Sequence, residues 1–321
     1  MKTTSEYQEF IENAIANLEL PSTPKGLYQP ILYSLESGGK RLRPVLTLAV
    51  ADALGLDINL VVNQALGIEL FHNFTLLHDD VMDNSEVRRG RPTVHCRWNA
   101  RTAILSGDAM SIIAGQVMAR GAGKSLDKIL ELFNKTAIEV IEGQQYDMDF
   151  EHRKDVTEDD YIEMVRLKTA VLLACACKTG ALMAGADAQV ADAFYDYGEK
   201  LGLAFQLRDD YLDTFGDPAI FGKAIGGDIT SDKKTWLLIN AIRDDKTGTI
   251  DKWLGVNARP ADKVQEVTDC YRILNLDTRC SQLIDSYIEQ AINQLNNIPG
   301  LSEEAREYFT KLADRSRTRS N

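Results

Sequence analysis

The chain has 321 residues, and its 48 Asp and Glu against 36 Lys and Arg give a formal net charge of −12. This length suits one large domain or two ordinary ones, and 44% hydrophobic with 26% charged residues is typical of a soluble globular protein. The negative charge argues against nonspecific nucleic-acid binding. No apolar run approaches the roughly 18 residues of a membrane span, and the N-terminus lacks the apolar core of a secretion signal.

Five cysteines are present, at positions Cys96, Cys175, Cys177, Cys270 and Cys280. None forms a CxxC pair, so the spacing argues against a zinc ribbon or a disulfide framework. We therefore expect free thiols in a cytoplasmic protein.

The first polar motif is the basic segment GGKRLRP at residues 38–44. Arginine presents a planar fork that suits phosphate oxygens, and glycine allows backbone to approach an anion closely. Taken alone, the segment indicates only a capped loop. Beside the carboxylates that follow, it indicates an anion pocket that includes Lys40 and Arg43.

The sequence LLHDDVMD at residues 76–83 places Asp79 and Asp83 four residues apart, on one face of a helix. Like charges at this spacing repel unless a cation offsets them, and hard oxygen ligands favour magnesium or calcium. Magnesium commonly completes its shell with phosphate oxygens and water, so a phosphorylated ligand is expected. A second basic motif, RRGRP at residues 88–92, follows directly and adds Arg88 and Arg89.

No proline lies between Pro92 and Pro218, which leaves this stretch free to form long helices. Apolar residues recur there at helical period, and we expect them on one face: Ile129, Leu132, Phe133, Ala137, Val140 and Ile141. Thr157, followed by three acids, is typical of a helix N-cap. Strand patterns are scarce, so we predict an all-α protein with one domain over residues 1–321.

A second acidic cluster, LRDDYLD at residues 207–213, echoes the first and includes Asp209, Asp210 and Asp213. A glycine-rich segment, GKAIGGD at residues 222–228, and Lys233-Lys234-Thr235 come next. This segment lacks the spacing of a nucleotide-binding P-loop. It is interpreted either as a surface turn or as a lysine-bearing loop that closes over phosphates.

Together these motifs resemble the trans-polyprenyl diphosphate synthases, over most of the chain. The matching segments stand in the family's order: GGKRLRP, LLHDDVMD with its DDxxD motif, RRGRP, GQQYD at 143–147, KT at 168–169, FQLRDDYLD at 205–213 and GKAIGGD. The resemblance implies a prenyltransferase of isoprenoid biosynthesis that joins isopentenyl diphosphate to allylic diphosphates. It also implies the isoprenoid synthase type I fold, a single-domain bundle of long helices around a deep central cavity, usually as a homodimer.

The resemblance further implies a role for each matching residue. Asp79, Asp83 and Asp209 would bind magnesium directly, and three ions would bind with the substrate diphosphate. Asp80, Asp210 and Asp213 would be further or outer ligands. The allylic diphosphate would meet Arg88, Lys168, Lys223 and Lys233, and isopentenyl diphosphate would meet Lys40, Arg43, His72 and Arg89. Thr169 and Gln206 would lie where the carbocation forms.

Two points stay open in the sequence. Phe74, five residues before Asp79, looks like the floor of the tail cavity, which favours a twenty-carbon product over fifteen carbons; the alternative is that Phe74 only packs the core. Ser231-Asp232 stands where the family often has a glycine, so spacing from Asp228 favours Lys233 over Lys234 as the phosphate ligand without excluding Lys234.

Two rival classes remain. A class I terpene cyclase also uses an aspartate-rich motif, but it lacks a second diphosphate pocket to explain Lys40, Arg43 and Arg89. A non-catalytic subunit of a two-component synthase usually loses part of an aspartate motif, and both motifs are whole here. Isopentenyl incorporation by the purified chain separates these alternatives.

Overall fold

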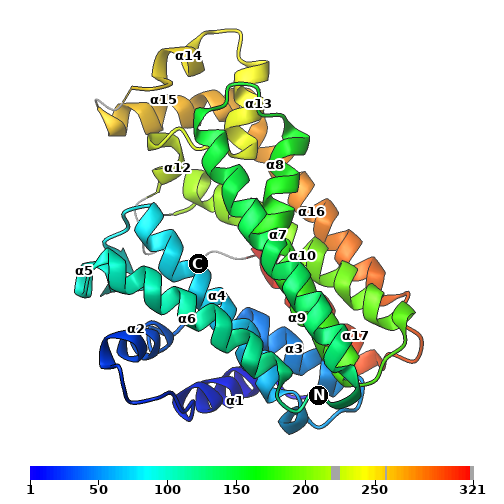
Figure 1. Cartoon of the computed structure of the whole chain (residues 1–321). Coiled ribbons are helices and arrows are strands. Elements are labelled where there is room, and N and C mark those ends of the chain that lie inside the picture. The colour runs from blue at the N-terminus through cyan, green and yellow to red at the C-terminus, as the bar shows by residue number, and fades with distance from the viewer. Residues whose placement is uncertain (218–224, 257–258, 319–321) are drawn as a thin grey trace. The chain divides into compact units, whose positions relative to one another are not determined.

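The structure, a computed structural model, describes residues 1–217, 225–256 and 259–318, and most of them are helical (Figure 1). Within these ranges the strands form one antiparallel hairpin, in which β1 (Val87–Arg88) pairs with β2 (Arg91–Pro92). The prediction of an all-α protein is confirmed.

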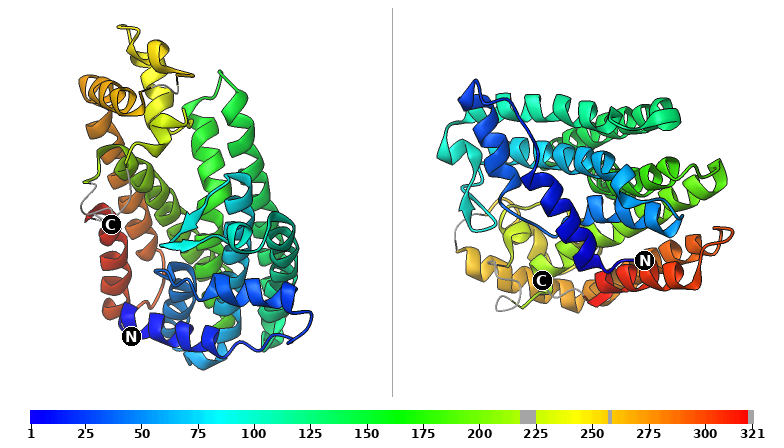
Figure 2. Two further views of the ribbon diagram at one scale, coloured as in Figure 1. Left: turned by 90° about the vertical axis from the view of Figure 1, so that its left-hand side faces the viewer. Right: turned by 90° about the horizontal axis from the view of Figure 1, so that it is seen from below.

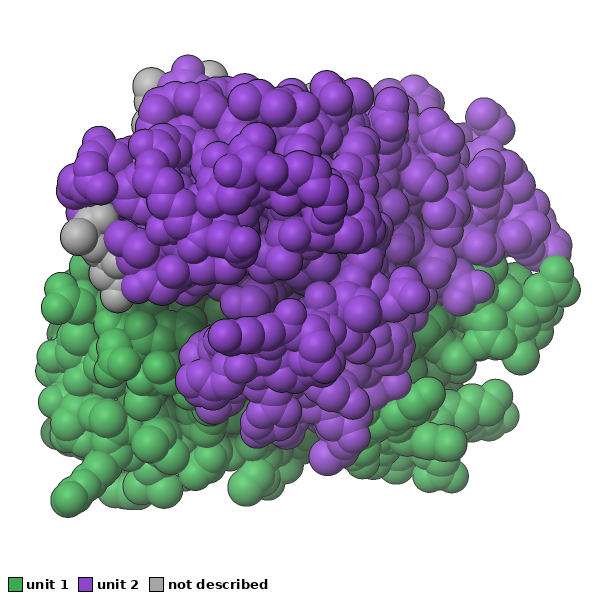
Figure 3. Space-filling model, turned by 90° about the horizontal axis from the view of Figure 1, so that it is seen from above, with its two compact units in different colours: residues 1–135, 175–195 green, residues 136–174, 196–321 purple. Residues whose placement is uncertain are grey.

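The chain divides into two compact units, coloured separately in Figure 3. Unit 1 contains residues 1–135 and 175–195, and unit 2 contains residues 136–174 and 196–321. The divisions fall inside three helices, α7 (Leu126–His152), α9 (Val171–Met183) and α10 (Ala188–Phe215). A single domain over the whole chain stays a prediction.

Unit 1 is built on α4 and α6, which pack along each other (Figure 1). α2 packs against α6, and α3 against α4. Besides the hairpin and the starting part of α7, the elements of this unit are α1 (Thr4–Ala16), α2 (Lys25–Leu35), α3 (Leu42–Ala53), η1 (Ile58–Leu60), α4 (Val62–Met82), α5 (Val94–Arg97), α6 (Ala100–Ala119) and η2 (Gly123–Ser125).

In unit 2, α16 and α17 lie side by side, orange and red in both views of Figure 2. α13 packs against α8 and α16, and α15 packs against α12 and α14. The elements of this unit, besides its parts of α7, α9 and α10, are α8 (Glu158–Val165), the π-helical segment η3 (Arg166–Ala170), α12 (Gly227–Thr230), α13 (Trp236–Asp244), α14 (Thr249–Trp253), α15 (Pro260–Ile273), α16 (Leu276–Leu295) and α17 (Glu303–Thr318).

The helical pattern along α7 is confirmed at Ile129, Phe133 and Val140, which are buried. Ile141, which the spacing places on the same face, is nevertheless 51% exposed. Thr157 caps α8 as predicted, since its side chain accepts a hydrogen bond from the Asp160 amide in a capping box.

All five cysteines are free thiols, as predicted; Cys96 is exposed and the other four are buried. No membrane span is expected from the sequence, yet among the described residues one helix, α6, is by length and composition alone long and apolar enough to cross a membrane. Only 39% of its apolar window is buried in the protein, and core helices of soluble proteins pass the same test.

Candidate active site

Four of the predicted substrate ligands gather in unit 1. Arg43 lies at the start of α3, and its Nη1 is 3.2 Å from Nε2 of His72 on α4. Arg89 donates a hydrogen bond to the carbonyl of Gly38, which lies two residues before Lys40. The structure therefore brings the segment 38–43 together with His72 and Arg89.

The hairpin explains how Arg89 reaches this segment. Arg89 and Gly90 form its two-residue turn, and both have positive φ, 51° and 74°. Such left-handed pairs match the twist of two hairpin strands. Gly39 allows the Arg89 side chain to approach the segment closely, because a Cβ at this position would lie 2.8 Å from the Arg89 guanidinium.

The positive charge of this cluster affects the pKa of His72. Burial lowers the pKa of His72 well below its ordinary value, and the positive charges of Arg43, Arg89, Arg88 and Arg41 lower it further. Burial and the charge of Arg41 also lower the pKa of Arg89. A cluster in which neighbouring cations disfavour each other is suited to an anion.

Arg41, which the sequence interpretation left without a role, is the buried support of this cluster. Its side chain is fully buried, and Nη1 lies 2.7 Å from Oε1 of the buried Glu69. Nε lies 2.8 Å from Oε1 of Glu12, and Nη2 donates to the Leu35 carbonyl at 2.6 Å. Burial alone would lower the pKa of Arg41, but Glu12 and Glu69 raise it above its ordinary value. Arg41 thereby fixes the backbone between Lys40 and Arg43.

The first acidic cluster lies at the C-terminal end of α4. Asp79 and Asp80 are in the last turns, and Asp83 is the C-cap, with its amide donating to the Asp79 carbonyl at 2.8 Å. The predicted one-turn spacing is thus present. Asp80 is 5% exposed, and both Nε and Nη2 of Arg88 lie 2.8 Å from its Oδ1.

Phe74 lies on α4 among other rings. Its ring centroid is 4.8 Å from that of His78 and 5.3 Å from that of Phe71, which in turn packs against Phe133. His78 is held apart from the acidic cluster because its Nε2 lies 3.0 Å from the Ile104 carbonyl on α6. Phe74 thus takes part in an aromatic group one turn before the aspartates.

In unit 2, the predicted Lys168 and Thr169 lie in the π-helical segment η3. Lys168 pairs with Asp147 of the GQQYD motif on α7. The glycine of that motif is required here, because a Cβ on Gly143 would lie 2.3 Å from the Lys168 amide nitrogen. Single π-helical turns inside helices are frequent at functional sites.

A chain of hydrogen bonds joins this segment to the second acidic cluster. Thr169 Oγ1 donates to Gln206 Oε1 at 3.1 Å, and Gln206 Nε2 donates to Asp210 Oδ1 at 2.9 Å. The hydroxyl of the buried Tyr161 donates to the other Asp210 oxygen at 2.5 Å. Burial and the Asp210 charge raise the pKa of Tyr161 well above its ordinary value. Tyr161 was not predicted, because one tyrosine in a helical pattern carries no signal of this contact.

The loop after α10 is attached to the same cluster. Asp213 accepts a hydrogen bond from the Asp228 amide at 2.9 Å, and Lys233 Nζ lies 3.5 Å from Asp228 Oδ1. Burial raises the pKa of Asp228 to about 7, with Asp210 and Asp213 adding to the rise and Lys233 opposing it. Desolvation lowers the pKa of Lys233, but the negative charges of Asp210, Asp228 and Asp147 raise it above its ordinary value overall. Lys223 lies outside the described residues.

The donor set in each unit fits magnesium. Among the described residues no three His, Cys, Asp or Glu side chains are grouped to hold an ion alone. Magnesium seldom needs such a cage, since one or two carboxylates with phosphate oxygens and water suffice. Both carboxylate oxygens of Asp210 already accept hydrogen bonds, which suits an outer ligand of the metal. Asp79 and Asp209, which directly precede Asp80 and Asp210 in their helices, are half-buried.

Comparison with known proteins identifies the class. The profile of the polyprenyl synthetase family matches residues 24–274, and the chain belongs to this family. A solved geranylgeranyl pyrophosphate synthase superposes with a TM-score of 0.96 at 38% identity, covering 100% of both chains.

Two relatives differ in the product that their names give. The geranylgeranyl diphosphate synthase of Methanosarcina mazei is 38% identical over 289 residues, which cover 89% of this chain and 88% of the relative. The geranylfarnesyl diphosphate synthase of Aeropyrum pernix is 36% identical over 303 residues, which cover 91% and 94%.

The environment of His72 predicts a pH effect on stability in the ligand-free protein. Because the folded-state pKa of His72 is lowered, the contribution of neutral His72 to the free energy of unfolding is complete above about pH 6.5. This contribution is lost as the pH falls from that value toward the lowered folded-state pKa. The variant His72→Gln should therefore lose less stability than wild type between pH 7 and pH 5, measured as urea midpoints. His152→Gln, at an exposed position, is the control; equal pH slopes in wild type and His72→Gln would contradict the prediction.

Proposed function

We propose that this protein is a magnesium-dependent prenyltransferase that condenses isopentenyl diphosphate with an allylic diphosphate, head to tail and in the trans configuration. Its product is a short-chain prenyl diphosphate, with geranylgeranyl diphosphate favoured and farnesyl diphosphate second. The observation that carries the proposal is the pairing of a cationic cluster on Arg43, His72 and Arg89 with an aspartate-rich helix end in the same unit. Membership of the polyprenyl synthetase family supports it.

The two diphosphates are assigned to different groups. Isopentenyl diphosphate binds the cluster in unit 1, made by Lys40, Arg43, His72 and Arg89. An anion there offsets the arginine charges that, together with burial, lower the pKa of His72. The allylic diphosphate binds Arg88, Lys168, Lys223 and Lys233 together with magnesium.

Magnesium is held by Asp79, Asp83 and Asp209, with Asp80, Asp210 and Asp213 as further or outer ligands. When bound, it neutralises the negative charge that develops on the departing diphosphate. Asp80 and Asp210 are oriented for this task by Arg88, and by Tyr161 and Gln206.

The reaction begins when the C1–O bond of the allylic substrate breaks and the electron pair leaves with the diphosphate. The allylic cation is stabilised by the oxygens of Lys168, Thr169 and Gln206, of which the last two are hydrogen-bonded to each other. The π electrons of the isopentenyl double bond form the new C–C bond, and a C2 proton passes to the released diphosphate. The positive charges of Arg88, Lys168 and Lys233 are electrostatic stabilisers of the leaving group.

We further propose that the two units belong to one synthase domain, because the family match at residues 24–274 runs through both. A cytoplasmic location stays a prediction that is based on the free cysteines.

The test is a product analysis with magnesium, labelled isopentenyl diphosphate and, separately, dimethylallyl, geranyl and farnesyl diphosphates. A twenty-carbon product is expected. No incorporation from any starter would overturn the proposal in favour of a terpene cyclase or a non-catalytic subunit.

The variants Asp79→Ala and Asp209→Ala, one in each unit, should each lower kcat by about 100-fold or more, as expected for removal of one electrostatic stabiliser of the leaving group. Circular dichroism should remain that of wild type, and removal of magnesium with EDTA should abolish turnover. Glu9→Ala, an exposed carboxylate on α1, is the matched control. Full activity in either aspartate variant would contradict the metal assignment of that cluster.

The Phe74→Ala variant should lengthen the product by one or more five-carbon units, because it opens space in the aromatic group before Asp79. Chromatography of the dephosphorylated alcohols measures this. Phe10→Ala, half-buried on α1, should leave chain length unchanged. An unaltered twenty-carbon product from an active Phe74→Ala variant would assign Phe74 to core packing alone.

We also propose a homodimer, supported by the exposed apolar side chains on α6. Leu105 is 60% exposed and Ile112 is 64% exposed, and a spacing of seven residues puts both on one helix face. The double variant Leu105→Glu with Ile112→Glu should shift the mass in light scattering from two chains to one chain of 35.8 kDa. Leu60→Glu, which is also 60% exposed, is the control, and an unchanged mass of the double variant would contradict this interface.

A further inference from the structure

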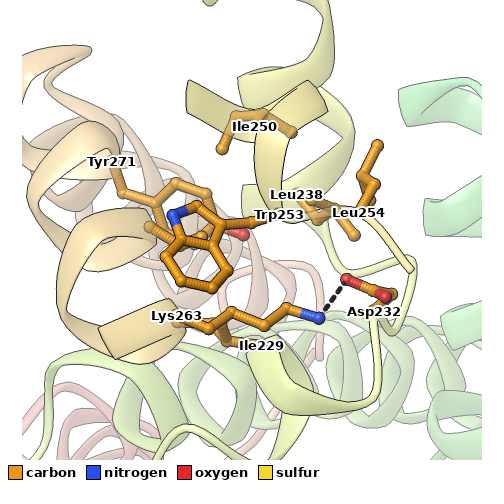
Figure 4. Close-up of a pocket in the computed structure, with 9 residues that line it drawn as sticks. Ile229, Asp232, Leu238, Ile250, Trp253, Leu254, Lys263 and Tyr271 are labelled. Carbon is orange, nitrogen blue, oxygen red and sulfur yellow. Dashed lines mark ion pairs between the residues drawn. The ribbon is translucent and has the colours of Figure 1, made fainter. Parts of the chain in front are cut away.

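Unit 2 contains a lysine that none of the family motifs includes. Lys263 on α15 is 1% exposed, and lysines are almost never fully buried unless they are paired. Its Nζ lies 2.7 Å from Oδ1 of Asp232 and donates to the Thr230 carbonyl at 3.4 Å. Figure 4 shows the Lys263 side chain extending toward Asp232.

The surroundings of Lys263 do not suit a ligand. Trp253, Tyr271 and Ile229 line the same small cavity, whose volume of about 10 Å³ is room for roughly one water molecule (Figure 4). The charge of Lys263 therefore serves a protein contact, and the carboxylate in that contact belongs to Asp232.

Asp232 connects three parts of the chain. It lies in the loop after α12, its Oδ1 meets Lys263 on α15, and its Oδ2 accepts a hydrogen bond at 2.9 Å from the Gly255 amide beyond α14. Its backbone has φ 54°, a left-handed conformation that costs energy for any residue with a Cβ. The two side-chain contacts hold the backbone in this conformation.

The next residue is Lys233, so the anchor acts one peptide from a proposed diphosphate ligand. The Lys233 amide donates to the Asp228 carbonyl at 3.0 Å, and its Nζ lies near the Asp228 carboxylate. Lys234, in contrast, turns back, with its Nζ 3.3 Å from the Asp232 carbonyl. With Asp232 fixed, Lys233 is directed to the acidic cluster and Lys234 is directed to the loop itself.

We propose that the buried Asp232–Lys263 ion pair is a positioning device for Lys233, and that it sets the affinity of the site for the allylic diphosphate. This inference rests on the proposed function. Neither Asp232 nor Lys263 touches substrate; both act through the backbone that carries Lys233.

The first test is the variant Lys263→Met, which keeps the length of the side chain and removes the charge. The KM for the allylic diphosphate should rise about tenfold, whereas the KM for isopentenyl diphosphate should stay within about twofold of wild type. Thermal stabilisation by inorganic pyrophosphate with magnesium should weaken in parallel, which is a readout independent of turnover. Lys252→Met is the matched control, since it removes an exposed lysine paired with Glu266 in the same part of unit 2.

The double variant Asp232→Asn with Lys263→Met covers the case in which the single variant does not fold. It leaves no unpaired charge, and asparagine tolerates the left-handed backbone. It should show the same selective rise in KM. A wild-type allylic KM, a parallel rise of both KM values, or loss of folding in both variants would overturn the inference. No isopentenyl transfer by wild type would instead overturn the proposed function on which it rests.

Discussion

The repulsion between like charges is the constraint on which the charged cluster of each unit depends. Unit 1 gathers guanidinium groups around His72. In unit 2 the charges of Asp210, Asp228 and Asp147 raise the pKa of Lys233, and burial, with Asp210 and Asp213, raises the pKa of Asp228. Each cluster is unfavourable alone and favourable with a counter-ion. In the proposed function, diphosphate is the counter-ion of the cationic cluster in unit 1, and magnesium is the counter-ion of the carboxylates in unit 2.

Concentrated charge requires rigid supports, and these are mostly residues that never meet substrate in the proposed function. Arg41 supports the cationic cluster through buried contacts with Glu69 and the Leu35 carbonyl. Tyr161 supports Asp210. Such supports fix the directions of charged side chains before a ligand arrives, which reduces the reorganisation needed during reaction.

Much of this organisation is predictable from the sequence because it depends on spacing along one helix or on local capping. The long stretch without proline predicted the all-α class. The four-residue spacing of Asp79 and Asp83 predicted a shared helix face, and Thr157 predicted the start of a helix. Exposure is harder to predict. Ile141 follows the apolar period of α7 yet is 51% exposed, because periodicity assigns a face without stating what covers it.

The contacts that escaped prediction join residues distant in sequence. Nothing local distinguishes Arg41 from its neighbours Lys40 and Arg43. Arg41 is nevertheless buried against Glu69, whereas Lys40 and Arg43 belong to the proposed site. The π-helical turn at Lys168 and Thr169 likewise depends on the close approach of Gly143 on another helix. Function-bearing residues were therefore easier to find than the residues that orient them.

The pair of Asp232 and Lys263 shows how a departure from a family pattern is compensated. A glycine at position 232 would adopt φ 54° without strain, whereas aspartate there costs about 1 kcal/mol. With glycine, however, Lys263 would be left buried without its carboxylate, and breaking a buried pair costs about 3–5 kcal/mol. Since the second cost exceeds the first, the aspartate is the more stable choice for as long as the lysine is present. The two positions are therefore constrained to change together, and the backbone strain at Asp232 is maintained by a side chain 31 residues further along the chain, at Lys263.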